Sequence, residues 1–250
     1  MNITHLVVNG CSWTYCQGLD NPREQGWPAL LAKKLNVPVV NLAVPGSGND
    51  AIHRRTYEYF FEDLPNNSKP LYIIAWSQLW RREIWNKDYY LPKNGYSAIR
   101  LPNGKPENHA EYALLDTWSN EDINRRTMLY RLSLDSLFKS KQTPYLASFF
   151  ADPIGHRKSS LVTKFPNTYD YLKGTPITDQ MLYEITNDGQ PKLPCGHDNA
   201  ITQVAIAEYL YNFLLKEHGE ITPVDGKFMT LLEYSKINAY PNTPIDTTWF

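Results

Sequence analysis

Four short apolar segments, separated by stretches with helical spacing, constrain what this chain can fold into. They are residues 3–8, 39–42, 71–76 and 145–150. The first is apolar on both faces, as expected of a central strand in a parallel sheet. Between the first two, Leu31 and Leu35 fall on one side of an amphipathic helix that opens at Trp27-Pro28. This strand–helix–strand spacing predicts an α/β fold with a parallel sheet and right-handed crossovers.

The remaining periodic stretches predict three more helices, near residues 49–61, 121–141 and 200–215. Two long stretches between them, near residues 86–119 and 151–190, have little periodicity and are interpreted as loop insertions. We expect one α/β domain over residues 1–217, followed by a C-terminal extension over residues 218–250.

The composition excludes several classes of function. With a formal net charge of -1 there is no global field to attract nucleic acid or an anionic membrane. The three cysteines have no CxxC spacing, which favours a reducing compartment and argues against a zinc site. The sequence has no signal-peptide pattern and no apolar stretch long enough to span a bilayer. We therefore expect a cytoplasmic protein, or one associated with a virus particle.

A glycine-bearing turn follows the first apolar segment. Asn9-Gly10-Cys11-Ser12 places a serine just after a glycine that permits a sharp bend at the strand end. A hydroxyl presented there can face a cleft, and its own N–H can point at a developing oxyanion. The same pattern is also typical of an ordinary turn or a helix cap. Ser12 is thus a candidate nucleophile.

The next two apolar segments also end in loops that can line a cleft. Gly46 lies in the loop after the second segment, where a backbone N–H suits an anion, and Asn49 or Asp50 is expected to cap the following helix. Trp76 and Gln78 come at the end of the third segment. Because ligands collect at the carboxyl edge of parallel strands, we expect these residues to line a pocket.

One histidine stands directly before the last predicted helix. His197 lies in Leu193-Pro194-Cys195-Gly196-His197-Asp198-Asn199, and a loop joined to a helix in this way can hold an imidazole rigidly against the cleft. A lone histidine in such a loop is also compatible with a structural role. The other five histidines have no comparable setting.

Taken in order, these segments resemble the blocks of the SGNH (GDSL-like) hydrolase superfamily. Residues 9–12 are similar to its first block, with Cys11 in place of the Asp of Gly-Asp-Ser. Residues 41–46 resemble the second block, residues 76–78 fall where the third has Gly-x-Asn, and residues 196–199 resemble the fifth. The resemblance covers roughly residues 3–215 and is greatest to the SGNH-like proteins common in bacteriophage genomes.

The resemblance implies a three-layer α/β/α, flavodoxin-like fold with a central parallel sheet of about five strands. It also implies that Ser12 is the nucleophile and His197 the general base. The oxyanion hole would be formed by the N–H groups of Ser12 and Gly46 with a side-chain amide. That amide would come from Gln78, which is a methylene longer than the family's Asn, or from Asn49.

The sequence departs from the family where the base is oriented. The family places an Asp three residues before the His, and Pro194 occupies that position here. Loss of such a carboxylate from a working triad costs on the order of 10^4 in rate. A backbone carbonyl in residues 193–196, Asp152 or Asp188 are candidates for the same role, whereas Asp198 is adjacent to the base and poorly aimed at it.

The function implied is that of a serine esterase or deacylase acting on a small ester or an acylated glycan, with no cofactor and no metal. Trp13 and Trp76 suit a sugar face, and Arg82 is a further candidate substrate contact, with a solvated helix start as the alternative for its charged cluster. The main alternative is a catalytically weak or inactive SGNH-like protein that binds a glycan or belongs to a phage particle. A nucleotide-binding domain is disfavoured because the first loop lacks both GxGxxG and a P-loop Lys.

Overall fold

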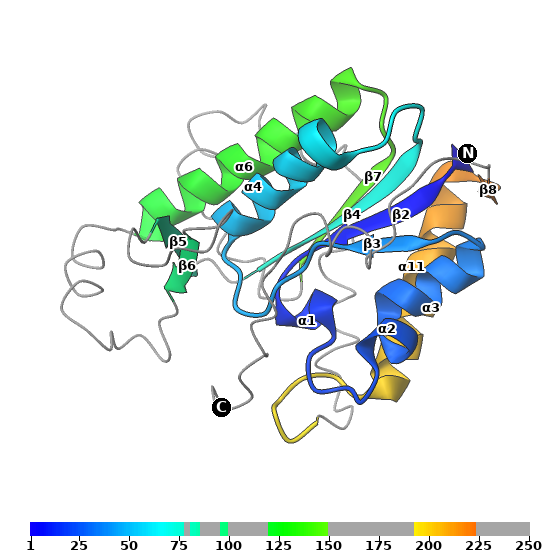
Figure 1. Ribbon diagram of the computed structural model, residues 1–250, viewed down its shortest axis with the longest axis horizontal. Coiled ribbons are helices and arrows are strands. Elements are labelled where there is room, and N and C mark those ends of the chain that lie inside the picture. The colour runs from blue at the N-terminus through cyan, green and yellow to red at the C-terminus, as the bar shows by residue number, and fades with distance from the viewer. Residues whose placement is uncertain (78–80, 86–95, 100–119, 150–192, 224–250) are drawn as a thin grey trace.

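The computed structural model describes residues 1–77, 81–85, 96–99, 120–149 and 193–223 (Figure 1). Its centre is a parallel sheet with the strand order β3-β2-β4-β7. The strands are β2 (His5–Asn9), β3 (Val39–Asn41), β4 (Pro70–Trp76) and β7 (Tyr145–Phe149). In chain order the arrangement is 2-1-3-4, which is that of flavodoxin-like sheets. The predicted parallel α/β sheet is confirmed, with four of its expected strands among the described residues.

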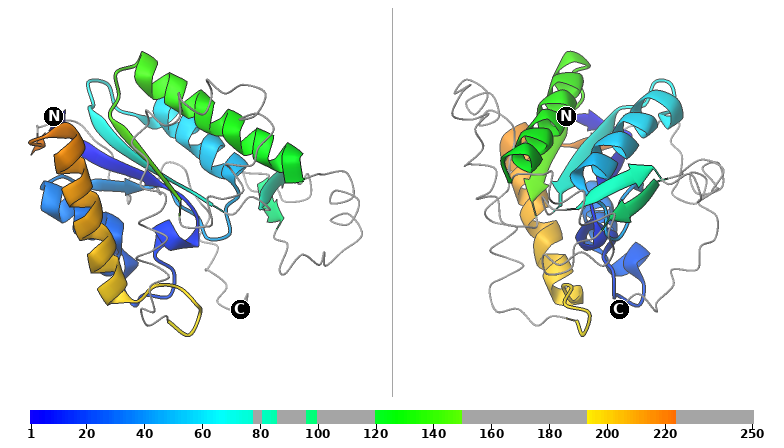
Figure 2. Two further views of the ribbon diagram at one scale, coloured as in Figure 1. Left: turned by 180° about the vertical axis from the view of Figure 1, so that it is seen from behind. Right: turned by 90° about the vertical axis from the view of Figure 1, so that its left-hand side faces the viewer.

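Helices cover both faces of this sheet, and Figure 2 shows the three layers edge-on. One face carries α3 (Trp27–Leu35) and α11 (Ala200–His218), and the other carries α4 (Asn49–Glu58) and α6 (Asn120–Ser140). Side chains alternate between the two layers: Leu6 and Val8 of β2 pack in the α3–α11 core, and Val7 packs in the α4–α6 core. This two-sided burial explains why the strands are continuously apolar and confirms the three-layer prediction.

Shorter elements complete the described part of the chain. They are β1 (Asn2–Ile3), α1 (Ser12–Tyr15), α2 (Pro22–Gln25), a π-helical turn η1 (Tyr59–Asp63), β5 (Arg82–Trp85), β6 (Tyr96–Ile99) and β8 (Thr222–Pro223). β5 and β6 form an antiparallel pair, and β8 pairs in parallel with β1, so the chain just beyond residue 217 returns to the N-terminal strand. Most of the two predicted insertions, and residues 224–250, lie outside the described residues.

The ends of the helices follow local chemistry. α3 has a Pro in its first turn and ends at Asn36, whose φ of 53° is the left-handed conformation that Asn tolerates. α11 has Asn199 as its N-cap, with Oδ1 accepting a hydrogen bond from the Thr202 N–H at 3.0 Å. The predicted cap of α4 is wrong: the N-cap is Gly48, which has no side chain to cap with, and Asn49 is the first helical residue, whose amide bonds to Ser77 instead. Within the described ranges, no helix has both the length and the apolarity needed to cross a membrane.

A buried histidine lies at the start of β2. His5 is fully buried, with Nδ1 2.8 Å from Thr4 Oγ1 and Nε2 3.1 Å from the Tyr59 hydroxyl. Burial lowers the pKa of the His5 imidazole to about 4. The ring is therefore neutral at physiological pH and acts as a hydrogen-bonding core residue.

We expect the free energy of unfolding to fall as the pH is lowered from about 6.5 towards 4. The folded protein keeps His5 neutral down to a pKa of about 4, whereas the unfolded chain takes up that proton near pH 6.5. Between these values the unfolded chain binds more protons, so acid favours it by about 1.4 kcal/mol per pH unit for this group. Above about pH 6.5, His5 makes no contribution to the pH dependence of the free energy of unfolding.

The measurement is urea unfolding across this pH range for the wild type and His5→Gln. The variant should show a shallower pH dependence. Burial also lowers the pKa of His53 to about 4, and its contribution is common to both proteins, so the difference between them isolates His5. Identical slopes would contradict the prediction.

Candidate active site

The carboxyl ends of β2, β3 and β4 lie at one edge of the sheet because the three strands are parallel. The chain leaves β2 through a tight passage at Gly10. A Cβ there would lie 2.1 Å from Thr14 Oγ1 and 3.0 Å from the Ala75 carbonyl oxygen. Gly10 is thus required by this close approach of α1 and β4, and the positive-φ residues of the chain do not include it.

Ser12 is the first residue of α1, directly beyond this passage. Cys11 is the N-cap, with extended φ and ψ of -107° and -154°. As the first helical residue, Ser12 has an N–H with no intrahelical acceptor. The residue is 5% exposed. The short helix ends at Cys16, whose φ of 63° turns the chain back. The structure therefore holds Ser12 at the sheet edge where the sequence predicted it.

The loop after β3 forms a tight turn beside this helix. The Ser47 N–H donates to the Val44 carbonyl at 3.2 Å, and Gly46 has a φ of +80°. With Pro45 in the second position, this is the pattern of a type II turn, which needs a glycine third. The Val44 N–H also donates to the Gly10 carbonyl at 3.4 Å. Gly46 thus lies in a turn docked against the end of β2.

Asn49 joins this loop to the end of β4. Its Oδ1 accepts from the Ser77 N–H at 2.7 Å, and its Nδ2 donates to the Ser77 carbonyl at 3.2 Å and to Thr127 Oγ1 at 3.3 Å. The amide therefore has partners on both of its ends. Donation from Asn49 to an oxyanion would require the loss of one of these bonds.

The other predicted residues near β4 have different settings. Trp76 is 2% exposed and packs in the core with Ile74 and Phe138, so its indole is a core side chain and the expected sugar contact is not matched by this placement. Arg82 begins the strand β5 rather than a helix. Gln78 lies outside the described residues.

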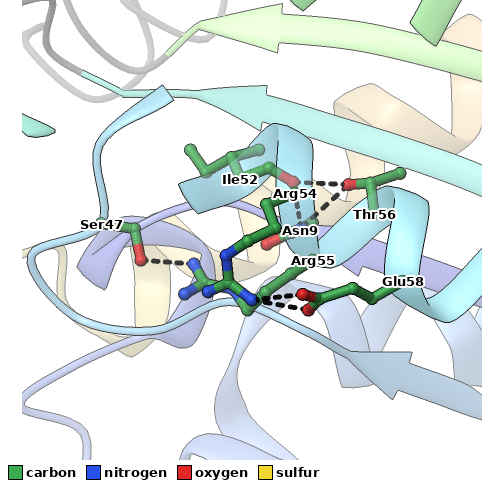
Figure 3. Close-up of polar contacts among 7 residues, drawn as sticks. All are labelled: Asn9, Ser47, Ile52, Arg54, Arg55, Thr56 and Glu58. Carbon is green, nitrogen blue, oxygen red and sulfur yellow. Dashed lines mark hydrogen bonds and ion pairs between the residues drawn. The ribbon is translucent and has the colours of Figure 1, made fainter. Parts of the chain in front are cut away.

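A polar network beneath the site connects β2 to α4, and Figure 3 shows it. The buried Asn9 amide donates to the Ile52 carbonyl and to Thr56 Oγ1, both at 2.9 Å. Its Oδ1 accepts from the Gly10 N–H at 2.8 Å. In the same view, Arg55 donates to the hydroxyl of Ser47 in the type II turn. These contacts position the backbone that carries Ser12 relative to the Gly46 turn.

The loop that carries His197 is closed by backbone hydrogen bonds. The Leu193 N–H donates to the His197 carbonyl, and the Gly196 N–H donates to the Leu193 carbonyl, both at 2.8 Å. Two residues later Asn199 caps α11. The position of the imidazole is therefore set by this compact loop and by the helix that follows it. Pro194, at the family's carboxylate position, is exposed.

Contacts between side chains bring this loop to the Ser12 side of the molecule. The ring of Trp13, the residue after Ser12, lies 5.4 Å from the His197 ring between centroids, with the planes tilted by 51°. A Cβ on Gly18 would meet Cys195 Sγ at 2.5 Å, so the loop after α1 passes directly against the histidine loop. The sequence separates these two segments by more than 170 residues. The fold joins them.

Gln203 of α11 strengthens the same junction. Its Oε1 accepts from the Trp27 N–H at 3.0 Å and from Cys16 Sγ at 3.2 Å, so one buried amide ties α11 to both α1 and α3. Burial, and to a lesser degree the nearby Asp198 carboxylate, raises the pKa of the Cys16 thiol to about 12. Cys16 therefore remains a neutral thiol with a packing role.

Sequence reasoning did not identify three of these residues: Asn9, Arg55 and Gln203. Asn9 ends an otherwise apolar segment and Gln203 interrupts the apolar face of a helical repeat, so each carried a weak signal of a buried amide. The sequence carried no signal that Arg55 is buried, because Arg55 follows Arg54 in a polar stretch. In the described part of the chain, no group of three or more His, Cys, Asp and Glu side chains is placed to hold a metal ion.

Three solved structures with a similar fold are named as esterases. The psychrotrophic esterase EstA from Pseudoalteromonas sp. is 13% identical, with 87% of this chain and 100% of that chain covered and a TM-score of 0.51. A carbohydrate esterase family 2 enzyme from Corynascus thermopiles (Myceliophthora fergusii) is also 13% identical, covering 87% and 67%, with a TM-score of 0.51. A family two carbohydrate esterase from Clostridium thermocellum is 12% identical, covering 88% and 66%, with a TM-score of 0.50.

At these identities the likeness establishes the fold, which is the α/β/α fold of the SGNH hydrolases. By its sequence the chain belongs to the family described as "Family of unknown function (DUF6071)", whose model matches residues 14–161. The matched range includes the Gly46 turn, whereas Ser12 and His197 lie outside it. No curated protein sequence matches the chain.

Replacing Gly10 by Ala should lower the free energy of unfolding by about 3 kcal/mol, because the added methyl overlaps Thr14 and approaches the β4 backbone. Gly219→Ala is the matched control. Gly219 has a φ of +69° but no atom within 4 Å of its added Cβ, so only backbone strain of about 1 kcal/mol is expected there. Denaturant unfolding of both variants measures the difference. Equal losses of stability would show that Gly10 is not sterically required.

Proposed function

We propose that this protein is a serine esterase of the SGNH type that removes acetyl or other small acyl groups from a glycan or a small ester. The observation that carries the proposal is the contact between Trp13, which follows the candidate nucleophile, and the ring of His197, the candidate base. A hydroxyl and an imidazole at one edge of a parallel sheet are what acyl transfer by a serine requires. The docked turn at Gly46 adds a backbone N–H at the same edge.

In the proposed mechanism, Ser12 Oγ attacks the ester carbonyl while His197 accepts the hydroxyl proton. The new C–O bond forms as the carbonyl electrons move to oxygen, and the N–H groups of Ser12 and Gly46 stabilise that oxyanion. One such donor is worth about 3 kcal/mol. Collapse expels the alcohol, which takes the proton from His197. Water, deprotonated by His197, then releases the acid from the acyl-enzyme. Gln78 remains the proposed side-chain donor to the oxyanion.

Two features support an acylated glycan as the substrate. Two of the enzymes with this fold are named carbohydrate esterases, and the Clostridium thermocellum structure holds cellohexaose. Trp13 is partly buried at the candidate site, where the rest of its indole can pack against a sugar face. Arg82 remains a proposed substrate contact. The glycan proposal is therefore narrower than the esterase proposal and can fail without it.

The exposed Pro194 favours one alternative, a protein that binds an acylated glycan but turns it over slowly or not at all. A component of a phage particle that uses this fold for attachment would have that property. Binding of an acetylated oligosaccharide without release of acetate would favour this alternative.

Replacing Ser12 by Ala should abolish turnover of p-nitrophenyl acetate and labelling by a fluorophosphonate, because both need the hydroxyl as nucleophile. His197→Asn should lower turnover by about 10^3-fold or more. The control is Ser140→Ala, which removes an exposed hydroxyl at the end of α6 whose one partner among the described residues is the Leu137 carbonyl. A wild-type rate no higher than that of Ser12→Ala would defeat the esterase proposal.

Removing the Trp13 ring should weaken the base. An aromatic face about 5 Å from an imidazolium stabilises it by about 0.5–2 kcal/mol, and the Trp13 ring lies 5.4 Å from His197. We expect Trp13→Ala to lower kcat about tenfold and to move the acidic limb of kcat/KM to lower pH, whereas Trp13→Phe keeps most of both. A change confined to KM would indicate that Trp13 contacts only substrate.

A further inference from the structure

Arg55 of α4 is a buried cation with almost no hydrogen-bond partners. It is 5% exposed, and its one hydrogen bond among the described residues runs from Nη2 to Ser47 Oγ. Its Nε–H is buried without an acceptor. None of the ion pairs within the described part of the chain includes it. The side chain thus brings a positive charge into the protein without forming an ion pair to any carboxylate of the described residues.

The neighbouring arginine shows that a partner was available on the same helix. Arg54 donates from Nη1 to both carboxylate oxygens of Glu58, at 2.7 and 2.6 Å (Figure 3). That pair lies on the partly exposed side of α4. Glu58 therefore pairs with the more exposed arginine of α4, whereas the buried Arg55 bonds to the Ser47 hydroxyl.

Such an arrangement costs folding free energy. A guanidinium is always charged, and burial of a charge without an opposite charge is unfavourable. Proteins retain features that break a folding rule mainly where function needs them. The place of Arg55 in the fold therefore indicates its role better than its single hydrogen bond does.

That position is directly behind the type II turn that contains Gly46. Ser47 Oγ accepts from Arg55 and donates to the Val44 carbonyl at 2.6 Å, so the hydroxyl braces the turn from within. One side chain separates the guanidinium from the Gly46–Ser47 peptide. In Figure 3 the Arg55 guanidinium points from α4 toward Ser47 in the loop.

We infer that Arg55 is a positioning residue for the oxyanion turn, holding the Gly46 N–H in place through Ser47 and adding fixed positive charge behind it. This inference rests on the proposed esterase function. Preorganised charges and dipoles at a water-excluded site stabilise the negative charge that develops in the transition state. Because that charge is greater in the transition state than in the bound ester, the effect belongs to kcat and hardly to KM.

The test compares four variants of the full-length protein: Arg55→Met, Arg55→Lys, Ser47→Ala and the matched control Arg54→Met. Each is measured for kcat and KM on p-nitrophenyl acetate and for Tm. We expect Arg55→Met to lower kcat about tenfold with KM within about twofold. Its Tm should equal or exceed that of the wild type, because an uncompensated buried charge is removed.

The other variants separate charge from geometry. Arg55→Lys should recover part of kcat, since the charge remains but the fork that reaches Ser47 is lost. Ser47→Ala should lower kcat and also Tm, because it leaves the cation with no partner. Arg54→Met should leave kcat unchanged.

Two results would overturn the inference. In the first, Arg55→Met lowers Tm below that of Arg54→Met while kcat stays within twofold of the wild type, as a purely structural role requires. In the second, Arg55→Lys has the same kcat and the same Tm as Arg55→Met, so that the retained positive charge has no effect. A wild-type protein without turnover would instead refute the proposed function, and this inference with it.

Discussion

The parallel pairing of β2 with β3 and β4 is the constraint on which the rest of the structure depends. Every residue from His5 to Asn9 is buried, and each strand enters the sheet in the same direction. The three loops that follow these strands must therefore leave at one edge. Ser12, the Gly46 turn and Ser77 lie at that edge for this reason, whatever their separation along the chain.

Backbone and amide hydrogen bonds then join these loops to one another. Val44 donates to the Gly10 carbonyl, and Asn49 forms a two-way link to Ser77. The Asn41 amide donates to the Thr14 carbonyl at 3.1 Å, which fastens α1 to the end of β3. A buried amide that meets all its partners specifies a single arrangement, because any other leaves a polar group unsatisfied. These bonds fix the loops after β2, β3 and β4 relative to one another.

The histidine side of the site is held differently. α11 packs on the α3 face of the sheet, and Gln203 connects it to Cys16 and Trp27. His197 itself contacts Trp13, an aromatic ring, and the nearby Pro194 is exposed. An aromatic face stabilises an imidazolium far less than a buried carboxylate does. Under the proposed mechanism we therefore expect slow turnover, with the charge of Arg55 behind the Gly46 turn as partial compensation.

Much of this architecture was readable in the sequence, because it depends on local patterns. Apolar runs of strand length, the helix that opens at Trp27-Pro28 and the glycine-bearing turns each reflect the conformational preference of a few adjacent residues. Such patterns predicted the parallel sheet and both covering layers correctly. They failed at Trp76, which an apolar strand carries into the core, and at the cap of α4, where Asn49 bonds across the sheet edge instead.

The sequence by itself determined the order of strands, helices and polar strand ends, since that order depends on the conformational preferences of adjacent residues. Only the tertiary structure decided which of those ends touch. Two of these contacts join groups far apart in the chain: Trp13 with His197, and Gln203 with Cys16. The burial of Arg55 likewise depends on elements that are distant in sequence. Packing and desolvation act on such groups only after the layers have closed, and no local preference records their outcome.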